Sequence, residues 1–242
     1  MQLEQIKYPA QESMPLTEPF FHMAFSVDCV IFGFDGNELK ILLIKRGEEP
    51  FGGYWALPGN LIYLNENIHD GAARVLSELT GLQNVYLEQV ETFGTVNRHP
   101  LGRVITTAYY SLVKIADCIV FAQSHAEDVS WFPISKVSDL AFDHLEILKA
   151  CMQKLKKIVR GRPVGFELLP PKFTLSELQR LYEAILEYPM DKRNFRKKIL
   201  SMNILVELEQ YQEGVAHRPA RLYKFDEEKY KRFVEEGFSF AV

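Results

Sequence analysis

Three charged side chains in the stretch from Leu57 to Leu82 are placed so that they could do chemistry together. Glu66 lies eight positions before Arg74, and Glu78 lies four positions after it. Carboxylates held close together can bind a divalent cation, and they can equally pair with an arginine. Because Arg74 stands between the two glutamates, we expect both carboxylates to form salt bridges with it rather than to serve as polar groups of a pocket.

A helix with a loop before it must position these side chains. The run Pro58-Gly59-Asn60 is typical of a turn, and Asn65 is placed to cap a helix that we expect from about Glu66 to Thr80. Gly81 follows where a left-handed residue commonly ends a helix. The apolar stripe of this helix is formed by Ile68, Ala72, Val75, Leu76 and Leu79.

The stretch resembles the Nudix box, whose pattern is G-x5-E-x7-R-E-U-x-E-E-x-G-U, with U an aliphatic residue. The first glycine and two of the glutamates are replaced, by Asn60, Val75 and Leu79. An unrelated amphipathic helix after a loop is the plain alternative, and the shared register of the matching positions argues against it. The residues that we assign to this degenerate box are Gly59, Glu66, Arg74, Glu78 and Gly81.

The replaced glutamates bear on the chemistry that the resemblance implies. Nudix hydrolases hold a divalent metal on carboxylates one helical turn apart, so that the metal clamps a diphosphate and activates water. Residues 75, 78 and 79 share one helix face, and only Glu78 among them is acidic. Since Mg²⁺ requires several oxygen ligands, we expect no metal, no catalytic residue and no hydrolase activity. The alternative is an active Nudix hydrolase of ADP-ribose-like nucleoside diphosphate derivatives, with Glu88 or Glu91 as a substitute ligand.

The charges divide unevenly along the 242 residues. Residues 1–148 hold 9 Lys/Arg and 19 Asp/Glu, which gives −10, whereas residues 149–242 hold 19 and 13, which gives +6. A basic second part favours a polyanionic partner. The hydrophobic content of 47% is sufficient for packed cores in one large or two modest domains.

The cysteines and the N-terminal segment indicate a protein of the cytoplasm. Cys29, Cys118 and Cys151 lack metal-ligand spacing, and we expect each to be a small buried hydrophobe in a reducing compartment. Residues 1–22 are polar and contain three prolines, which predicts an N-terminal arm without a signal-peptide pattern. No stretch approaches the ~18 apolar residues of a membrane span, so we expect no membrane partner.

Strands and one long helix are predicted between residues 23 and 160, which we take as the first domain. Gly161 and Pro163 break the chain there, and the second domain is expected from 164 to 242. The segment Glu48–Ala56 reads as a loop. Strands are expected at Phe25–Phe34, Leu39–Ile44, Val85–Val96, Val104–Ile115 and Val129–Pro133, and a helix at His144–Val159.

The second domain reads as two capped helices and a hairpin. Thr174 and Glu177 form the signature of a capping box for the first helix, and Asp191 can cap the second, Lys192–Met202. Helices in this order predict a helix-turn-helix, and a hairpin after it predicts a β-wing. The two strands of the hairpin are expected at Val206–Tyr211 and Leu222–Phe225.

The polar arc of the helix Lys192–Met202 carries side chains suited to DNA. Arginine can bind guanine and asparagine can read adenine, so we expect base contacts from Arg193, Asn194 and Lys197. A solvated basic face is the plain alternative, but the wing, the capping box and the uneven charge favour DNA. The remaining residues that we expect at this DNA surface, mainly on phosphates, are Lys172, Lys192, Arg196, Lys198, Arg218 and Arg221.

The run LLPPKFTLSELQRLYEAILEYPMDKRNFRKKIL, followed by HRPARLYKF, is similar to the C-terminal winged helix of Nudix-related transcriptional regulators of the NrtR type. The likeness covers roughly Phe25 to Phe225, and its most specific part is the motif Asp191–Arg196. It implies an α+β fold: a Nudix-like α/β/α sandwich with a mixed sheet, followed by a winged helix-turn-helix domain. It also implies a homodimer that binds a double-stranded DNA operator, answers to a small effector and needs no cofactor. That effector is ADP-ribose for part of the family, and a sugar such as L-arabinose in a related branch.

A Nudix cleft without a metal still offers a pocket for such an effector. Aromatic rings can stack on a base or pack on a sugar, and arginines can hold phosphate. The alternatives are core packing for Trp55 and surface ion pairs for Arg98 and Arg103, and we expect His99 to be only a loop residue. Effector binding would then change the angle between the two winged helices of a dimer. Our candidates for the pocket lining are Arg46, Trp55, Tyr63, Arg98 and Arg103.

Overall fold

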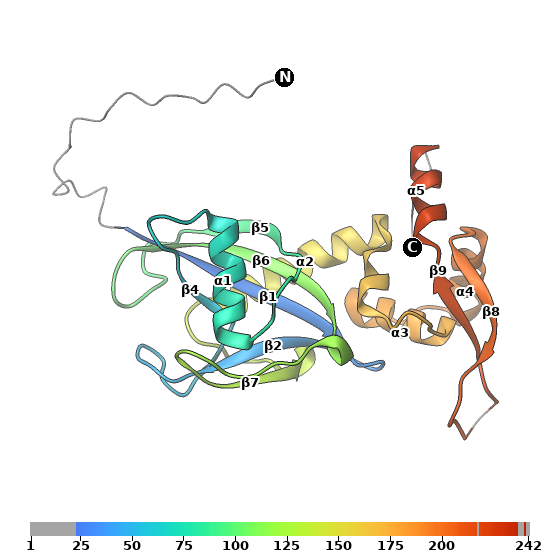
Figure 1. The fold of residues 1–242 in the computed structure, drawn as a ribbon, viewed down its shortest axis with the longest axis horizontal. Coiled ribbons are helices and arrows are strands. Elements are labelled where there is room, and N and C mark those ends of the chain that lie inside the picture. Colours follow the sequence, from blue (N-terminus) through green and yellow to red (C-terminus); the bar gives the residue numbers. More distant parts are fainter. Residues whose placement is uncertain (1–22, 217, 237–239, 241–242) are drawn as a thin grey trace.

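A seven-stranded mixed sheet forms the centre of the first domain (Figure 1). The computed structural model describes residues 23–216, 218–236 and 240, so the predicted arm at residues 1–22 lies outside the described part. The strands run in the order β3-β2-β1-β6-β5, with β4 paired to β1 and β7 paired to β2, and the pair β1/β6 is parallel. Their bounds are β1 Ala24–Phe34, β2 Leu39–Arg46, β3 Trp55–Ala56, β4 Gly59–Leu61, β5 Glu88–Phe93, β6 Val104–Lys114 and β7 Ala126–Pro133.

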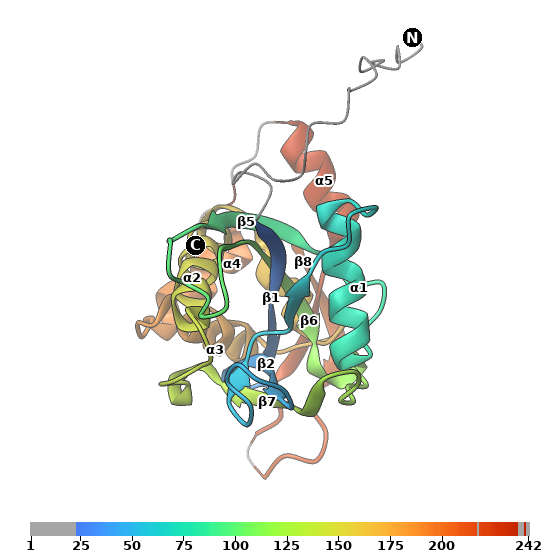
Figure 2. The ribbon, with the colours of Figure 1, turned by 90° about the vertical axis from the view of Figure 1, so that its left-hand side faces the viewer.

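Helices cover both faces of this sheet, as Figures 1 and 2 show. Side chains of β1 alternate between the faces because successive residues of a strand point in opposite directions. One set packs beneath α1 (Ile68–Thr80) and consists of Val27, Cys29 and Ile31. The other set packs beneath α2 (His144–Gly161) and consists of Val30, Phe32 and Phe34. The predicted α/β/α sandwich with a mixed sheet is therefore confirmed.

The helix of the degenerate box begins later than the sequence predicts. It starts at Ile68, and the residue at its N-cap position is Asn67 rather than Asn65. The reason is the Glu66 carboxylate, which accepts a hydrogen bond from the Tyr63 backbone N–H at 2.7 Å and so belongs to the preceding loop. The end of the helix is as predicted, because Gly81 adopts a left-handed conformation with φ 76°.

The sheet also differs from the prediction at its short strands. The expected loop Glu48–Ala56 ends in β3, and the expected turn around Gly59 begins β4. These strands span two and three residues, which is too short for an alternating pattern to show. The strand expected at Val85–Val96 is confined to β5, and its two flanks are irregular.

The second domain contains the predicted helix pair and hairpin. Both predicted caps are confirmed: the Glu177 backbone N–H donates to Thr174 Oγ1 at 3.1 Å, and the Thr174 N–H donates to Glu177 Oε2 at 2.7 Å. The Asn194 N–H donates to Asp191 Oδ1 at 2.8 Å. One helix at the end was not predicted. The elements are η4, a 3₁₀ helix (Pro163–Leu168), α3 (Leu175–Leu186), α4 (Lys192–Ser201), β8 (Leu205–Tyr211), β9 (Arg221–Phe225) and α5 (Glu227–Glu235).

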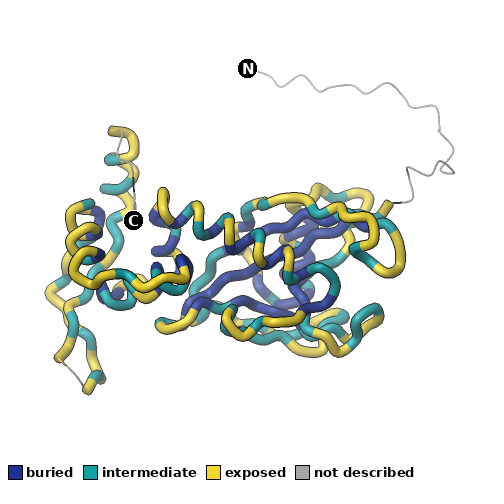
Figure 3. The backbone as a smooth tube through the Cα atoms, turned by 180° about the vertical axis from the view of Figure 1, so that it is seen from behind, coloured by how far each residue is buried: buried dark blue, intermediate teal, exposed yellow. Residues whose placement is uncertain are grey.

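The two predicted domains share a continuous hydrophobic core. The buried cluster beneath α2 extends through Val159 and Phe166 to Leu181 of α3 and Phe195 of α4. Figure 3 shows buried backbone across the junction. The winged helix is thus packed directly against the sheet domain. In the described part of the chain, no helix has both the length and the apolar composition needed to cross a membrane.

Candidate functional site: a polar cleft and an exposed basic helix

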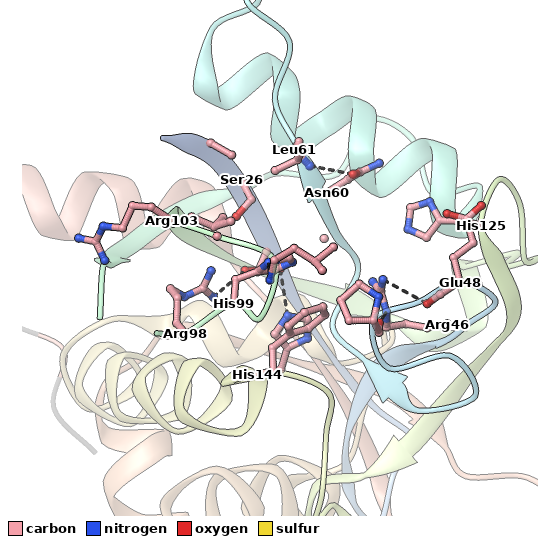
Figure 4. A pocket seen from close by; sticks show the side chains of 18 residues that line it. Ser26, Arg46, Glu48, Asn60, Leu61, Arg98, His99, Arg103, His125 and His144 are labelled. Atoms are coloured by element: carbon pink, nitrogen blue, oxygen red, sulfur yellow. Dashed lines mark hydrogen bonds and ion pairs between the residues drawn. The ribbon is translucent and has the colours of Figure 1, made fainter. Parts of the chain in front are cut away.

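A cleft of about 540 Å³ opens where the parallel strands β1 and β6 begin. It is walled by β4, by the end of β2 and the loop after it, by the loops before β6 and β7, and by His144 of α2. Figure 4 shows polar side chains converging on it from these elements. Its polar lining is formed by Ser26, Asp28, Arg46, Glu48, Asn60, Arg98, His99, Arg103, His125 and His144.

A buried carboxylate lies at the floor of the cleft. Asp28 is 4% exposed and accepts a hydrogen bond from Thr106 Oγ1 at 2.7 Å. His144 Nε2 lies 3.4 Å from Asp28 Oδ1, while His144 Nδ1 accepts the Leu57 backbone N–H at 2.9 Å. Because Nδ1 is an acceptor, the ring proton resides on Nε2 and faces Asp28. Burial lowers the pKa of His144 against the opposing effect of Asp28, so the ring is neutral at pH 7. A glycine is needed at position 59, because a Cβ there would overlap the Asp28 carboxylate.

An arginine closes the same cluster. Arg98 donates from Nε to Asp143 Oδ2 at 2.8 Å and from Nη2 to Asp143 Oδ1 at 2.6 Å. Its Nη2 also lies 3.7 Å from Asp28 Oδ2, and its side chain is only 4% exposed. Arg98 lines the cleft, as predicted. It also forms an ion pair with Asp143, but this pair is buried and not on the surface as the alternative supposed. We call these residues, Asp28, Arg98, Thr106, Asp143 and His144, the Asp28 cluster.

An aromatic ring next to this cluster gives the cleft a flat wall. Phe142 stacks on His99 with ring centroids 5.0 Å apart and planes 13° apart. The Arg46 guanidinium lies 5.0 Å from the centroid of the Phe142 ring, and Phe51 packs on the same ring at 4.7 Å. The pKa of His99 is lowered, first by burial and then by the charges of Arg98 and Arg46. His99 lies in the loop before β6, as expected, and it also lines the cleft, which was not expected.

The predicted aromatic lining residues lie elsewhere. Trp55 packs on Phe132 with ring centroids 4.5 Å apart and joins the core beneath α2. The alternative given for Trp55, core packing, is therefore the one observed. Tyr63 lies under the Arg74 guanidinium, 4.0 Å from it. Of the predicted arginines, Arg46 and Arg103 line the cleft together with Arg98. The rings that do line the cleft, Phe142, His99, His125 and His144, were not predicted.

The degenerate box forms a separate ion-pair cluster. Arg74 contacts Glu66 Oε1 at 2.6 Å and Glu78 Oε2 at 2.8 Å, which confirms the expected salt bridges. The hydrogen bond from Arg74 lowers the pKa of Glu66 to about 2. None of these three residues is part of the cleft lining. We call Tyr63, Glu66, Arg74 and Glu78 the Arg74 cluster.

The side chains that replace the two missing glutamates of the box point into the protein. Val75 is 0% and Leu79 is 1% exposed, and both belong to the core beneath α1. Among the residues that the structure describes, no group of three or more His, Cys, Asp or Glu side chains is arranged to hold a metal ion. The apolar replacements therefore fill space in the core at the positions where the Nudix pattern has carboxylates.

A second candidate surface lies on α4. Phe195 and Ile199 are buried, which turns the opposite arc of the helix to solvent. The predicted DNA-contacting residues that lie exposed on α4, before α3 or on the hairpin are Lys172, Lys192, Arg193, Asn194, Lys197, Lys198, Arg218 and Arg221. Arg221 is also engaged within the hairpin, by an ion pair to Glu207 and a 2.8 Å hydrogen bond to Tyr211 Oη.

Arg196 departs from this arrangement. Its Nη2 donates to Ser176 Oγ at 3.1 Å, and its side chain is half-buried between α4 and α3. Arg196 was predicted at the DNA surface, but its side chain bonds the two helices to each other. Residue type indicates what a side chain could bind and does not show which neighbour it meets.

Comparison with known families decides the relationship. Residues 23–151 match the NUDIX domain family, and residues 165–225 match the NrtR DNA-binding winged helix domain family. The chain belongs to the NrtR-type Nudix-related regulators. Among relatives, it is 37% identical over 204 residues to the ADPR responsive transcriptional repressor NtrR of Acinetobacter baylyi, covering 83% of this chain and 81% of that one. It is 34% identical over 137 residues to an ADP-ribose pyrophosphatase of Methanocaldococcus jannaschii, covering 55% and 76%.

Two solved structures give the same relationship in three dimensions. The NrtR of Shewanella oneidensis in complex with a 27mer DNA superposes with a TM-score of 0.69 at 29% identity, covering 89% of this chain and 97% of that one. The NUDIX domain of the same NrtR in complex with ADP ribose superposes with a TM-score of 0.52 at 33% identity, covering 55% and 88%. This chain thus has the NrtR arrangement of a Nudix domain followed by a winged helix.

Proposed function

We propose that this NrtR-type chain is an effector-responsive transcriptional regulator. Its Nudix domain would bind an ADP-ribose-like molecule in the cleft, and its winged helix would bind a double-stranded DNA operator. The proposal rests on three features that occur together in this chain. Three arginines line the cleft, and apolar residues stand at two positions of α1 where the Nudix pattern has glutamates. The basic helix α4 is exposed beside a hairpin. The relatives described as an ADPR responsive repressor, and as complexes with DNA and with ADP ribose, support it.

The charge of the cleft favours a diphosphate over a neutral sugar. The cavity is lined by Arg46, Arg98 and Arg103. A guanidinium group can donate two parallel hydrogen bonds to two oxygens of a phosphate. The stack of His99 on Phe142 supplies a flat surface against which a base can pack. The cavity volume of about 540 Å³ is typical of small-molecule sites. L-arabinose is the weaker candidate, because it carries no charge to pair with Arg46 and Arg103, for which the described structure shows no ion pair, whereas Arg98 is paired with Asp143.

Calorimetric titration with ADP-ribose and with L-arabinose distinguishes these effectors. We expect ADP-ribose to bind and L-arabinose to give no heat of binding at millimolar concentration. A variant Arg103→Gln should weaken ADP-ribose binding, because it removes a cleft cation while keeping a hydrogen-bonding side chain. Binding of the sugar alone would assign the chain to the sugar-responsive branch.

We also propose that the chain does not hydrolyse its effector. One carboxylate of the box, Glu78, is bound to Arg74, and the other two positions are apolar. The substitute Glu88 accepts a hydrogen bond from Tyr110 Oη at 3.0 Å and lies 3.4 Å from Lys154, so it is already engaged. The likeness to a pyrophosphatase keeps the hydrolase as the competing function. Incubation of ADP-ribose with Mg²⁺ or Mn²⁺ should yield no AMP; product formation that Glu78→Gln abolishes would establish the competing function.

The proposed DNA surface leads to matched substitutions. Arg193→Ala removes a proposed base contact and should relax sequence preference by about 1–3 kcal/mol at one base pair. Lys198→Ala removes a proposed phosphate contact. It should therefore lower the slope of log K against log salt concentration by about one unit. Arg196→Ala serves as the control, since this side chain faces α3 and its loss should change stability rather than salt dependence. We further propose a homodimer, whose recognition helices would lie about 34–36 Å apart in successive major grooves.

A further inference from the structure

The geometry points to a mechanical coupling between the cleft and the winged helix: an anionic group of the effector draws Arg98 away from Asp143, and the freed Asp143 caps α2 instead. This inference rests on the proposed function, because it assigns how the same cleft would control the same DNA-binding domain. It follows from the position of α2, from the unusual use of the Asp143 carboxylate and from the strained residue beside it.

Helix α2 connects the two sites directly. Its first turn lies in the cleft, where His144 is a lining residue. Its other end packs through Leu155 and Val159 into the core that contains α3, and Lys156 Nζ forms a 2.6 Å ion pair with Glu187 at the end of α3. Since close-packed helices move as units, a shift of the first turn is carried to α3 and hence to α4.

The Asp143 carboxylate can bind either Arg98 or the backbone N–H groups at the start of α2. It occupies the N-cap position of α2, where an aspartate ordinarily accepts hydrogen bonds from the N–H groups of the first turn. Here its side chain makes no cap hydrogen bond, and both oxygens are bound by Arg98. A ligand phosphate that attracts Arg98 would free the carboxylate to cap α2, once the ψ angle of Asp143 turns from 20° toward the extended range of an N-cap residue. One charge-assisted hydrogen-bonded arrangement is thereby exchanged for another, which is what a two-state element requires.

The residue before Asp143, Phe142, links the backbone at the start of α2 to whatever binds in the cleft. Phe142 has φ 55°, a left-handed conformation that is costly for a bulky side chain and persists only where neighbours hold it. Those neighbours include His99, Arg46 and Phe51, which contact its ring, and His99 and Arg46 also line the cleft. A ligand that repacks the ring also changes the backbone that starts α2.

The substitution Asp143→Asn tests the coupling in the full chain. Asparagine can still cap a helix, but it lacks the charge that holds Arg98. We measure ADP-ribose binding by calorimetry and promoter DNA binding by fluorescence anisotropy, with and without ADP-ribose. Coupling between two sites is typically about 5–150-fold. In Asp143→Asn we expect ADP-ribose to bind as tightly as in the wild type or more tightly, while its effect on the DNA Kd falls to about twofold or less. The ligand-free variant should already have the DNA affinity of the ADP-ribose-bound wild type.

Controls separate this coupling from a general structural role. Glu146→Gln removes an exposed negative charge from the same first turn of α2 and should keep the full response. Asp143→Ser, which caps well but cannot pair with Arg98, should behave like Asp143→Asn and replaces it if that variant fails to fold. In the wild type, ADP-ribose should also alter hydrogen exchange of the amides of residues 144–147.

The outcomes distinguish this inference from the proposed function. A full DNA response in both Asp143 variants, or loss of ADP-ribose binding itself in them, would overturn the coupling while the proposed function stands. Unchanged hydrogen exchange in the first turn of α2 would overturn it as well. A wild type that binds no ADP-ribose would overturn the proposed function, and the coupling with it.

Discussion

Two arginines of this chain lie between carboxylates, yet they do different work. Arg74 belongs to a family motif, is 19% exposed in its side chain and pairs with Glu66 and Glu78 away from the cleft lining. Arg98 belongs to no motif, is 4% exposed and pairs with Asp143 beside the cleft. The recognisable residues of a motif can therefore serve to stabilise a helix, while a charge that lines the cleft lies in a loop that no sequence pattern marks.

The largest difference between the two arginines should appear in stability. Arg98→Ala would leave Asp28 and Asp143 without their counter-charge in a buried site, which costs about 3–5 kcal/mol. Arg74→Ala removes a partly solvated pair and should cost about 1 kcal/mol or less. Urea denaturation of both variants measures the difference. Equal losses would show that the two clusters are energetically alike and would break the comparison.

A second effect concerns the space around Asp28. Gly59→Ala places a methyl group on the carboxylate oxygen, so strand β4 must shift, at a cost of about 1–3 kcal/mol. Gly161→Ala is the matched control, because open space surrounds that position at the end of α2. It should be neutral or stabilising by up to about 1 kcal/mol. Thermal denaturation compares them; a tolerated Gly59→Ala would mean that Asp28 is not held as tightly as described.

A third effect is the pH dependence of effector binding. Burial and the charges of Arg98 and Arg46 lower the pKa of His99 below its ordinary 6.5. An anionic ligand would raise it again, so the bound form takes up protons and affinity increases as the pH falls through 6.5 toward the lowered pKa of the ligand-free form. The gain is up to about tenfold for each pKa unit regained. Calorimetry with ADP-ribose at several pH values should show this slope, and His99→Asn should flatten it; an equal slope in the variant would exclude His99 as the source.

The smallest effect should belong to the Arg74 cluster. The hydrogen bond from Arg74 lowers the pKa of Glu66 from 4.5 to about 2. Between these values the unfolded chain binds more protons, so this contribution is complete above pH 4.5 and is lost as the pH falls toward 2. Glu66→Gln should therefore weaken the fall in melting temperature between pH 6 and pH 3 without changing ADP-ribose binding. A change in ligand affinity would place this cluster in the effector site after all.

The local signals of the sequence predicted most of the fold. The capping box at Thr174, the cap at Asp191 and the glycine stop at Gly81 were all readable because each depends on residues a few positions apart. The hairpin after α4 was predicted for the same reason. Short strands such as β3 and β4 depend on partners far along the chain, and no local pattern marks them.

The cleft was predicted only in part, because its residues meet through tertiary structure. Asp28, Arg98 and His144 are separated by dozens of positions and share no spacing. One signal could have found them: Asp28 is the sole charge in the run Ala24–Phe34, and a buried carboxylate must have charged or hydrogen-bonding partners. Trp55 and Tyr63 were misplaced because residue type indicates what a side chain could bind, whereas the face of a strand or loop decides what it meets.

The central claim is that one chain binds DNA and an ADP-ribose-like effector and couples the two. It is tested most directly by the anisotropy of labelled promoter DNA from its own operon, titrated with the full chain in chelator-containing buffer, with and without ADP-ribose. We expect sequence-specific binding with a Kd of about 10⁻⁸ M or tighter in one of the two states and a change of about fivefold or more between them. Binding that ignores DNA sequence, or an affinity that ADP-ribose leaves unchanged, would contradict it.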